Sequence, residues 1–124
     1  MIDTLDFGKY IYSKLKDLTD NRVYPLVADN NVEIPFIVYQ RIGLSTEYTK
    51  DGLLQDSVRM RISAVCETYA QSLKLAKEIR NRLVQETVEF DEMVIDEARI
   101  ISAIEEYNNS YIQTMEFEFT VNNL

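Results

Sequence analysis

The sequence predicts an α+β domain in which two helices pack on one face of a mainly antiparallel four-stranded sheet, in the order α-β-β-α-β-β. Apolar residues recur at helical spacing over residues 5–18 and 69–85. They alternate with polar residues over 57–66 and 111–121, as in half-buried strands. With 124 residues, the chain has the length of a single domain, 1–124.

The first helix is predicted over residues 5–18. Its apolar residues follow one another at spacings of four, four and three: Phe7, Ile11, Leu15 and Leu18. Asp3 or Thr4 precedes them and can cap the helix, because short polar side chains accept hydrogen bonds from the first free backbone N–H groups. Thr19-Asp20-Asn21 then supplies polar turn residues that end it.

Two proline-containing segments follow, Arg22-Val23-Tyr24-Pro25 and Glu33-Ile34-Pro35-Phe36-Ile37-Val38-Tyr39-Gln40. Each proline biases the residue before it toward extended backbone. We expect a loop over residues 22–34, with at most a short extended segment at Val23-Tyr24, and a strand over 36–42, where β-branched and aromatic residues dominate. Residues 43–55 have no sustained apolar period and contain the turn pair Asp51-Gly52, so they predict a long hairpin loop.

The strand over residues 57–66 should bury the side that carries Val58, Met60, Ile62, Ala64 and Cys66. A buried structural thiol is the ordinary state of a single cysteine such as Cys66. The second helix should follow with a stripe of Tyr69, Leu73, Ala76, Ile79 or Arg80, and Leu83, and should end near Gln85.

Two further strands are predicted over residues 98–106 and 111–121, joined by a tight turn at Asn108-Asn109. In the last strand, Tyr111, Gln113, Met115, Phe117, Phe119 and Val121 lie on the side that must be covered. The opposite sheet face then carries Arg59, Arg61, Arg99, Glu116 and Glu118. We expect this face either to be solvated or to meet a neighbouring subunit.

Composition argues against most catalytic and membrane roles. The chain has no His, one Cys and three Gly, and it lacks a nucleophile elbow, a paired CxxC and a phosphate-binding glycine loop. We therefore expect no enzyme activity and no cofactor. No apolar run approaches the roughly 20 residues that span a bilayer, and the N-terminus has no signal-peptide pattern. We expect a soluble protein of intracellular origin.

The net charge of −8 is concentrated in the second half, where residues 63–124 carry twelve acids against five bases. Six of these acids form an acidic segment without Lys or Arg: Glu86, Glu89, Asp91, Glu92, Asp96 and Glu97. Nucleic-acid binders present basic stripes, so we expect no specific nucleic-acid binding. A calcium site in this segment is the less favoured interpretation, because no glycine follows Gly52 to form a compact calcium loop.

Eight tyrosines in a chain without Trp are the remaining unusual feature. Tyrosine combines an apolar ring with a polar tip and is enriched at protein interfaces. Some of the eight can equally border the core with their hydroxyl groups in water. Tyr48 lies among polar residues of the predicted loop and is the best candidate for an interface.

The order of several segments resembles the small tail-to-head joining proteins of long-tailed bacteriophages and prophages, also called tail terminator or tail completion proteins. The resemblance covers nearly the whole chain. It rests on the first helix followed by Arg22-Val23-Tyr24-Pro25, on Ile34-Pro35-Phe36-Ile37-Val38-Tyr39-Gln40, on the Asp51-Gly52 loop, and on the run from Thr68-Tyr69-Ala70-Gln71 to Ile79-Arg80. The acidic segment matches no feature of that family.

The resemblance implies a virion tail subunit that forms a ring, typically six-fold, which ends the tail tube and docks it onto the head connector. Its partners would be further copies of itself, the tail-tube protein and head-connector proteins, after assembly in the bacterial cytoplasm. A closed ring needs a heterologous contact between two different patches. We expect the 43–55 loop and the strand edges to supply it, with Tyr48, Leu53 and Leu54 in contact and Arg59 and Arg61 facing a neighbour's acidic segment.

The competing hypothesis is a cytoplasmic regulatory module that binds a small ligand or a partner protein on the same scaffold, without catalysis. It predicts a monomer or dimer with a concave apolar pocket. Ring formation separates the two hypotheses.

Overall fold

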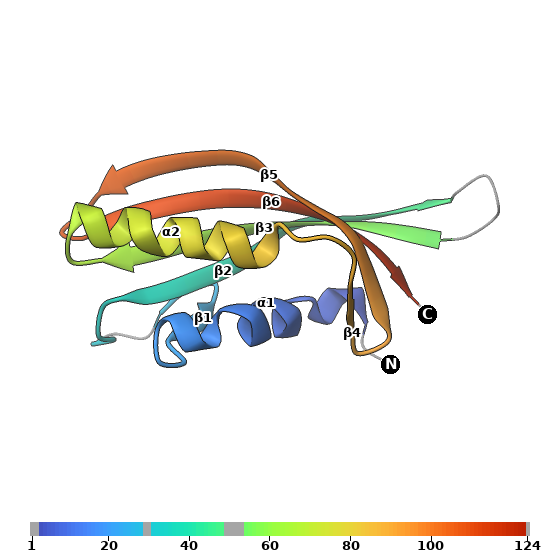
Figure 1. Cartoon of the computed structure of the whole chain (residues 1–124), viewed down its shortest axis with the longest axis horizontal. Helices are drawn as coiled ribbons and strands as arrows, with labels where there is room; N and C mark the ends of the chain where they lie inside the picture. The colour runs from blue at the N-terminus through green and yellow to red at the C-terminus, as the bar shows by residue number, and fades with distance from the viewer. Residues whose placement is uncertain (1–2, 29–30, 49–53, 124) are drawn as a thin grey trace.

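The computed structural model describes residues 3–28, 31–48 and 54–123. Over these residues the elements are η1 (Thr4–Asp6), α1 (Gly8–Leu15), η2 (Lys16–Leu18), β1 (Val23–Pro25), β2 (Phe36–Tyr48), β3 (Leu54–Cys66), α2 (Tyr69–Leu83), β4 (Val88–Phe90), β5 (Met93–Tyr107) and β6 (Tyr111–Asn123). The strands form one sheet in the order β1-β2-β3-β6-β5-β4 (Figure 1). Neither α1 nor α2 is long and apolar enough to cross a membrane.

The predicted four-stranded antiparallel sheet in the order α-β-β-α-β-β is wrong. The sheet has six strands over the described residues and is mixed, because β1 runs parallel to β2 while the other neighbours are antiparallel. The two additional strands, β1 and β4, are three residues long; β1 lies where a short extended segment was predicted at Val23-Tyr24, but not as part of the sheet. Such short strands show no alternation that a sequence pattern could reveal.

The predicted loop over residues 43–55 is also wrong over most of its length. Strand β2 continues to Tyr48, β3 begins at Leu54, and these two residues are register partners. A β-bulge between Arg41 and Gly43 shifts the pairing by one residue, and Leu44 pairs with Val58. The two strands form an arm that extends beyond the helices (Figure 1). The Asp51-Gly52 pair and Leu53 lie outside the described residues.

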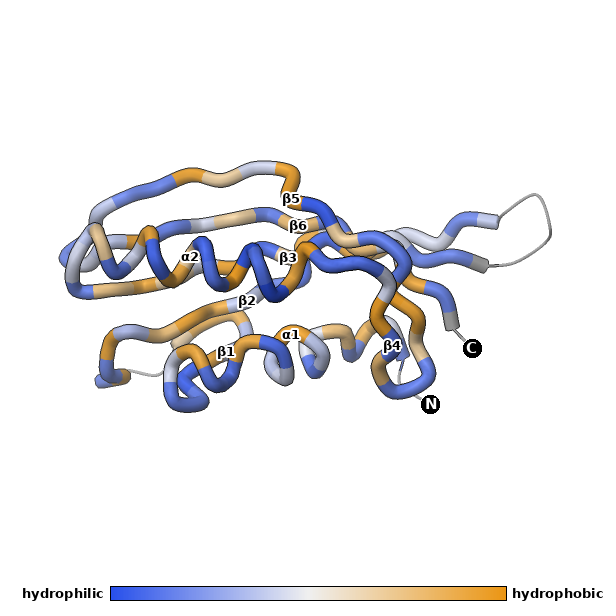
Figure 2. The backbone as a smooth tube through the Cα atoms, in the orientation of Figure 1, coloured by the Kyte–Doolittle hydropathy of each residue, from blue (hydrophilic) through white to orange (hydrophobic). Residues whose placement is uncertain are grey.

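The core lies between the helices and one face of the sheet, which we call the helix face. The predicted buried side of β3 is confirmed, since its five residues are between 0 and 1% exposed. The apolar residues Phe7, Ile11 and Leu15 of the first helical segment are also fully buried, as predicted. Figure 2 shows hydrophobic residues recurring along both helices and along the strands that they cover.

The sheet curls around α1. Tyr10 of α1 packs its ring 5.4 Å from that of Phe90 in β4, which is the last strand of the order. The Phe119 ring of β6 lies 6.3 Å from that of Tyr10 and 4.9 Å from that of Phe7, the residue before α1. Helix α1 is therefore held by aromatic rings from two separate strands.

The predicted apolar stripe of α2 has the wrong phase in its first two turns. The helix buries Ser72, Leu75, Ile79 and Leu83, whereas Tyr69 is 45% exposed. Ser72 is accommodated because its hydroxyl donates to the Tyr69 carbonyl and accepts from the Gln113 amide. A polar residue with both hydrogen bonds satisfied can occupy a core position that a hydropathy pattern assigns to an apolar one.

Candidate assembly interface

One long edge of the sheet belongs to β5. Strand β4 pairs with it only from Met93 to Ile95. Among the described strands, none pairs with residues 96–107 on that side. Helix α2 lies mainly over β3 and β6, so residues 101–107 are exposed on both faces of the sheet. Ile104 and Tyr107 are each 64% exposed, which makes this edge both open and partly apolar.

The opposite edge belongs to β2. Strand β1 pairs with β2 from Ile37 to Tyr39, and the Leu26 N–H donates to the Tyr39 carbonyl. Beyond that point, residues 40–48 have a neighbouring strand only on the β3 side within the described parts of the chain. The molecule therefore presents one open edge at each side of the same sheet.

The arm places two of the predicted contact residues at its tip. Tyr48 is 81% exposed and ends β2, and Leu54 begins β3 as its backbone partner. Leu53, the third predicted residue, lies outside the described residues. Contact between this tip and another subunit stays a prediction.

The outer face, opposite the helix face, carries an ion-pair network across β3, β6 and β5. The carboxylate of Glu118 accepts from Arg59 at 3.0 Å and from Arg99 at 2.8 Å, while Arg61 donates to Glu116 at 3.0 Å. Donation from Arg99 and Arg59 lowers the pKa of Glu118. Arg59 and Arg61 thus have acidic partners within their own chain, and the predicted contact with a neighbour's acidic segment stays a prediction.

The acidic segment surrounds β4 and the start of β5. All six of its acids are exposed: Glu86, Glu89, Asp91, Glu92, Asp96 and Glu97. Asp91 and Glu92 form the turn between the two strands with positive φ angles of 47° and 69°. Sequence reasoning missed this turn because such angles favour glycine or asparagine. The described residues contain no group of three or more Cys, Asp or Glu placed to hold a metal ion.

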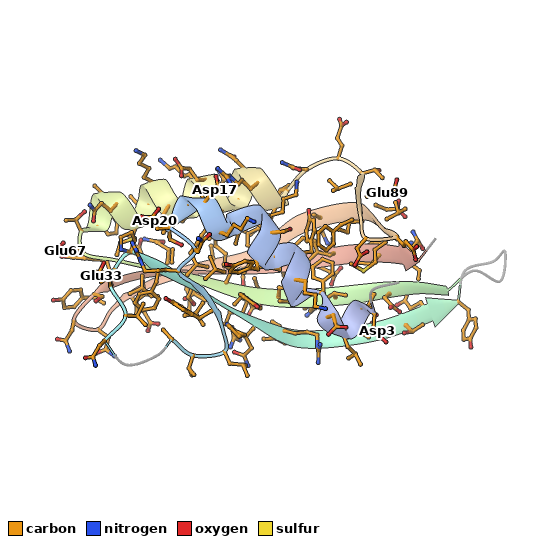
Figure 3. All side chains as sticks on the ribbon, turned by 90° about the horizontal axis from the view of Figure 1, so that it is seen from below. Asp3, Asp17, Asp20, Glu33, Glu67 and Glu89 are labelled. Carbon is orange, nitrogen blue, oxygen red and sulfur yellow. The ribbon has the colours of Figure 1, made fainter. Side chains whose placement is uncertain are left out.

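The acidic residues that Figure 3 labels lie on different parts of the molecule. Glu89 and Glu67 lie toward opposite ends of it. Asp96 accepts a hydrogen bond from the side-chain amide of Asn122 in the neighbouring strand.

A cluster of tyrosines lies at the end of β5, which sequence reasoning did not single out. The rings of Tyr107 and Tyr111 are 4.9 Å apart, and those of Tyr69 and Tyr111 are 6.0 Å apart. They border a cavity of about 250 Å³ together with Glu105 and Gln113. Glu105 accepts from the Gln113 amide at 3.1 Å and from the Tyr69 hydroxyl at 2.9 Å, and these bonds lower its pKa. The only signal in the sequence is the spacing of the tyrosines around the Asn108-Asn109 turn.

A second cavity, of about 340 Å³, lies between η1 and β2. Its walls include Phe7, Tyr39 and Met60, but also Asp6 and Arg41. The Arg41 guanidinium donates to the Leu5 carbonyl at 2.6 Å at this site. The lining thus combines apolar and charged side chains.

Comparison with known proteins finds a similar fold among solved structures but no matching sequence family. No protein-family profile matches the chain, and no curated protein sequence matches it. Among solved structures, a chain of the "Virion of native gene transfer agent (GTA) particle" is similar with a TM-score of 0.75 and 13% sequence identity. The match covers 91% of this chain and 92% of that chain. The protein therefore shares its fold, over nearly its full length, with a component of a gene transfer agent virion.

Proposed function

We propose that this protein is a structural subunit of a phage-like tail. It forms a ring that ends the tail tube at its head-proximal end and joins the tail to the head connector. The observation that carries the proposal is the pair of open edges, residues 40–48 of β2 and 96–107 of β5, at opposite sides of one sheet. The shared fold with a virion component supports the same role.

The directions of the strands suit a repeated contact. Strand β2 is antiparallel to β3, β3 to β6 and β6 to β5, so β2 and β5 run in opposite directions. The β5 edge of one copy can therefore receive the β2 edge of the next as another antiparallel strand. Two different patches meet in this contact, which is the heterologous type that closes into rings.

The role requires neither catalysis nor a cofactor, and its location is the virion tail. The partners are further copies of this chain within the ring, the tail-tube protein on one side and head-connector proteins on the other. The resemblance of the sequence to tail-to-head joining proteins implies six copies in the ring.

The test is solution mass by light scattering over a concentration series, with negative-stain images of the largest species. We expect 14.5 kDa subunits to assemble into closed rings of uniform diameter as the concentration rises. A strict monomer or a simple dimer at the highest concentration would count against the proposal. It would favour the regulatory-module hypothesis, which requires no ring.

A further inference from the structure

The open edge of β5 is long enough to pair with the whole open edge of β2. At residue 39 the β2 edge is occupied by β1, and at Ile95 the β5 edge is occupied by β4. The open part of β5, residues 96–107, therefore contains a segment, residues 98–106, that is as long as residues 40–48 of β2. An antiparallel contact between these segments leaves both short strands in place.

Both edges also contain a bulge, and the bulges fix which side chains share a face. In β2 the register shifts between Arg41 and Gly43, and in β5 it shifts between Ile100 and Ser102. The side chains of β2 on the helix face are Arg41, Leu44 and Thr46. Those of β5 on the same face are Ala98, Ile100, Ala103 and Glu105. On the outer face, β2 places Gly43, Ser45 and Glu47, while β5 places Arg99, Ser102 and Ile104.

We infer that residues 40–48 of β2 in one copy pair with residues 98–106 of β5 in the next copy, with Arg41 opposite Glu105 and Glu47 opposite Arg99. The inference rests on the proposed ring and specifies its contact. On the helix face the further pairs are Leu44–Ala103, Thr46–Ile100 and Tyr48–Ala98. On the outer face they are Gln40–Glu106, Gly43–Ile104 and Ser45–Ser102. Every pair keeps its two side chains on the same face of the sheet, because the bulge residues Ile42 and Ile101 have no partner across the contact.

The chemistry of the paired positions agrees with this register. Both of its charged pairs, Arg41–Glu105 and Glu47–Arg99, join opposite charges, which stabilises cross-strand neighbours. Ile104, 64% exposed in the isolated chain, lies opposite Gly43, which has no side chain to obstruct it. Arg99 also pairs with Glu118 of its own chain, so Glu47 of the neighbouring copy would extend the ion-pair network of the outer face.

The strongest competitor is a two-fold contact between the β5 edges of two copies. That contact would set each Arg99 opposite Glu106 on the outer face, but it would set Ile100 opposite Glu105 on the helix face. It would also leave residues 40–48 of both copies open. The β2–β5 contact covers both edges of every copy, which is the general solution to exposed strand edges.

Disulfide cross-linking between two single variants tests the register. Ser45→Cys and Ser102→Cys alter exposed serines, so each variant should fold, which circular dichroism can verify. Directly opposed strand residues have Cα atoms about 4.5–5.5 Å apart, within the range of a disulfide. Cys66 is 1% exposed and does not compete. We expect mild oxidation of the mixed variants to give dimers that contain one copy of each.

Matched controls separate the alternatives. Ser45→Cys mixed with Glu97→Cys, an exposed position on the same outer face beyond the paired segment 98–106, should give at least several-fold less product. Efficient dimers from Ala103→Cys alone would identify the two-fold β5 contact and overturn the inference. Rings in micrographs without a Ser45–Ser102 link would overturn the register but leave the proposed function standing. Neither rings nor links at any concentration would overturn both.

Discussion

The contact between the Phe7 and Phe119 rings should hold α1 on the sheet with a measurable coupling energy. Both side chains are fully buried, their ring centroids are 4.9 Å apart, and the rings are tilted by 49°. Aromatic pairs in this geometry contribute about 0.5–1.5 kcal/mol beyond the area that they bury. Phe119 also lies opposite Ala98, where the β5 segment that pairs in the proposed contact begins, so the ring contact supports the proposed interface.

The perturbation is Phe7→Leu, Phe119→Leu and the double variant. Leucine keeps the site apolar and nearly filled, so each single change should lower the free energy of unfolding by about 1.5 kcal/mol. At about 4 °C per kcal/mol for a chain of this size, each single change lowers Tm by about 6 °C. Removing either ring already abolishes the contact between them. The double variant should therefore lose about 0.5–1.5 kcal/mol less unfolding free energy than the sum of the two single losses. Urea denaturation at pH 7 measures all four proteins.

A control cycle combines Phe7→Leu with Cys66→Ala. Cys66 pairs with Tyr111, and the distance along β6 from Tyr111 to Phe119 is about 26 Å at about 3.3 Å a residue. The costs of these two changes should add within about 0.5 kcal/mol. A coupling of zero between Phe7 and Phe119, or an equal coupling in the control cycle, would refute the reasoning.

Two pH-dependent predictions follow from the shifted pKa values. Because hydrogen bonds from Arg99 and Arg59 lower the pKa of Glu118 in the folded state, its ionised carboxylate stabilises the fold above the usual glutamate pKa. That contribution is lost as the pH falls through the lowered pKa. Urea denaturation should therefore show Glu118→Gln to be less stable than the wild type at pH 7 and equally stable near pH 2. A difference in stability that persists in acid would contradict a stabilising role of the ionised Glu118 carboxylate. Burial raises the pKa of Tyr10 to about 12, so the folded state resists ionisation and loses stability as the pH rises from about 10 toward 12. Tyr10→Phe should lose less stability than the wild type between pH 9 and pH 11, and equal losses would exclude burial of the hydroxyl as the cause.

Local patterns in the sequence predicted the elements whose side chains alternate strictly. The buried sides of β3 and β6 followed from such alternation, since a half-buried strand has a period of two. Strand β4 has three residues and lies among acids, so no periodicity could reveal it. The arm was predicted as a loop because Ser45, Thr46 and Glu47 are polar, yet their backbone pairs with β3 and their exposure requires no apolar residue.

The candidate interface was harder to predict than the elements that form it. The residues of β5 were predicted to form a strand, but a strand becomes an edge only through the order of the whole sheet. That order depends on long-range pairing between β3 and β6, which lie far apart in the chain. Tyr48 was selected because an exposed aromatic residue among polar ones is visible locally, whereas the tyrosines around Glu105 meet only after β5 and β6 pair and α2 packs beside them.

The distribution of charge along the two edges also selects one register among the alternatives. If β2 slipped by two residues along β5 toward β4, Glu47 would lie opposite Glu97 on the outer face, and Arg41 would lie opposite Ala103. Like charges placed directly opposite each other destabilise a strand pair, so this slip replaces two favourable pairs with one unfavourable pair. A slip by one residue would exchange the faces of every side chain between the bulges. In the proposed contact, the register with Arg41 opposite Glu105 and Glu47 opposite Arg99 keeps both opposite-charge pairs, so we expect it to be favoured over these two slips.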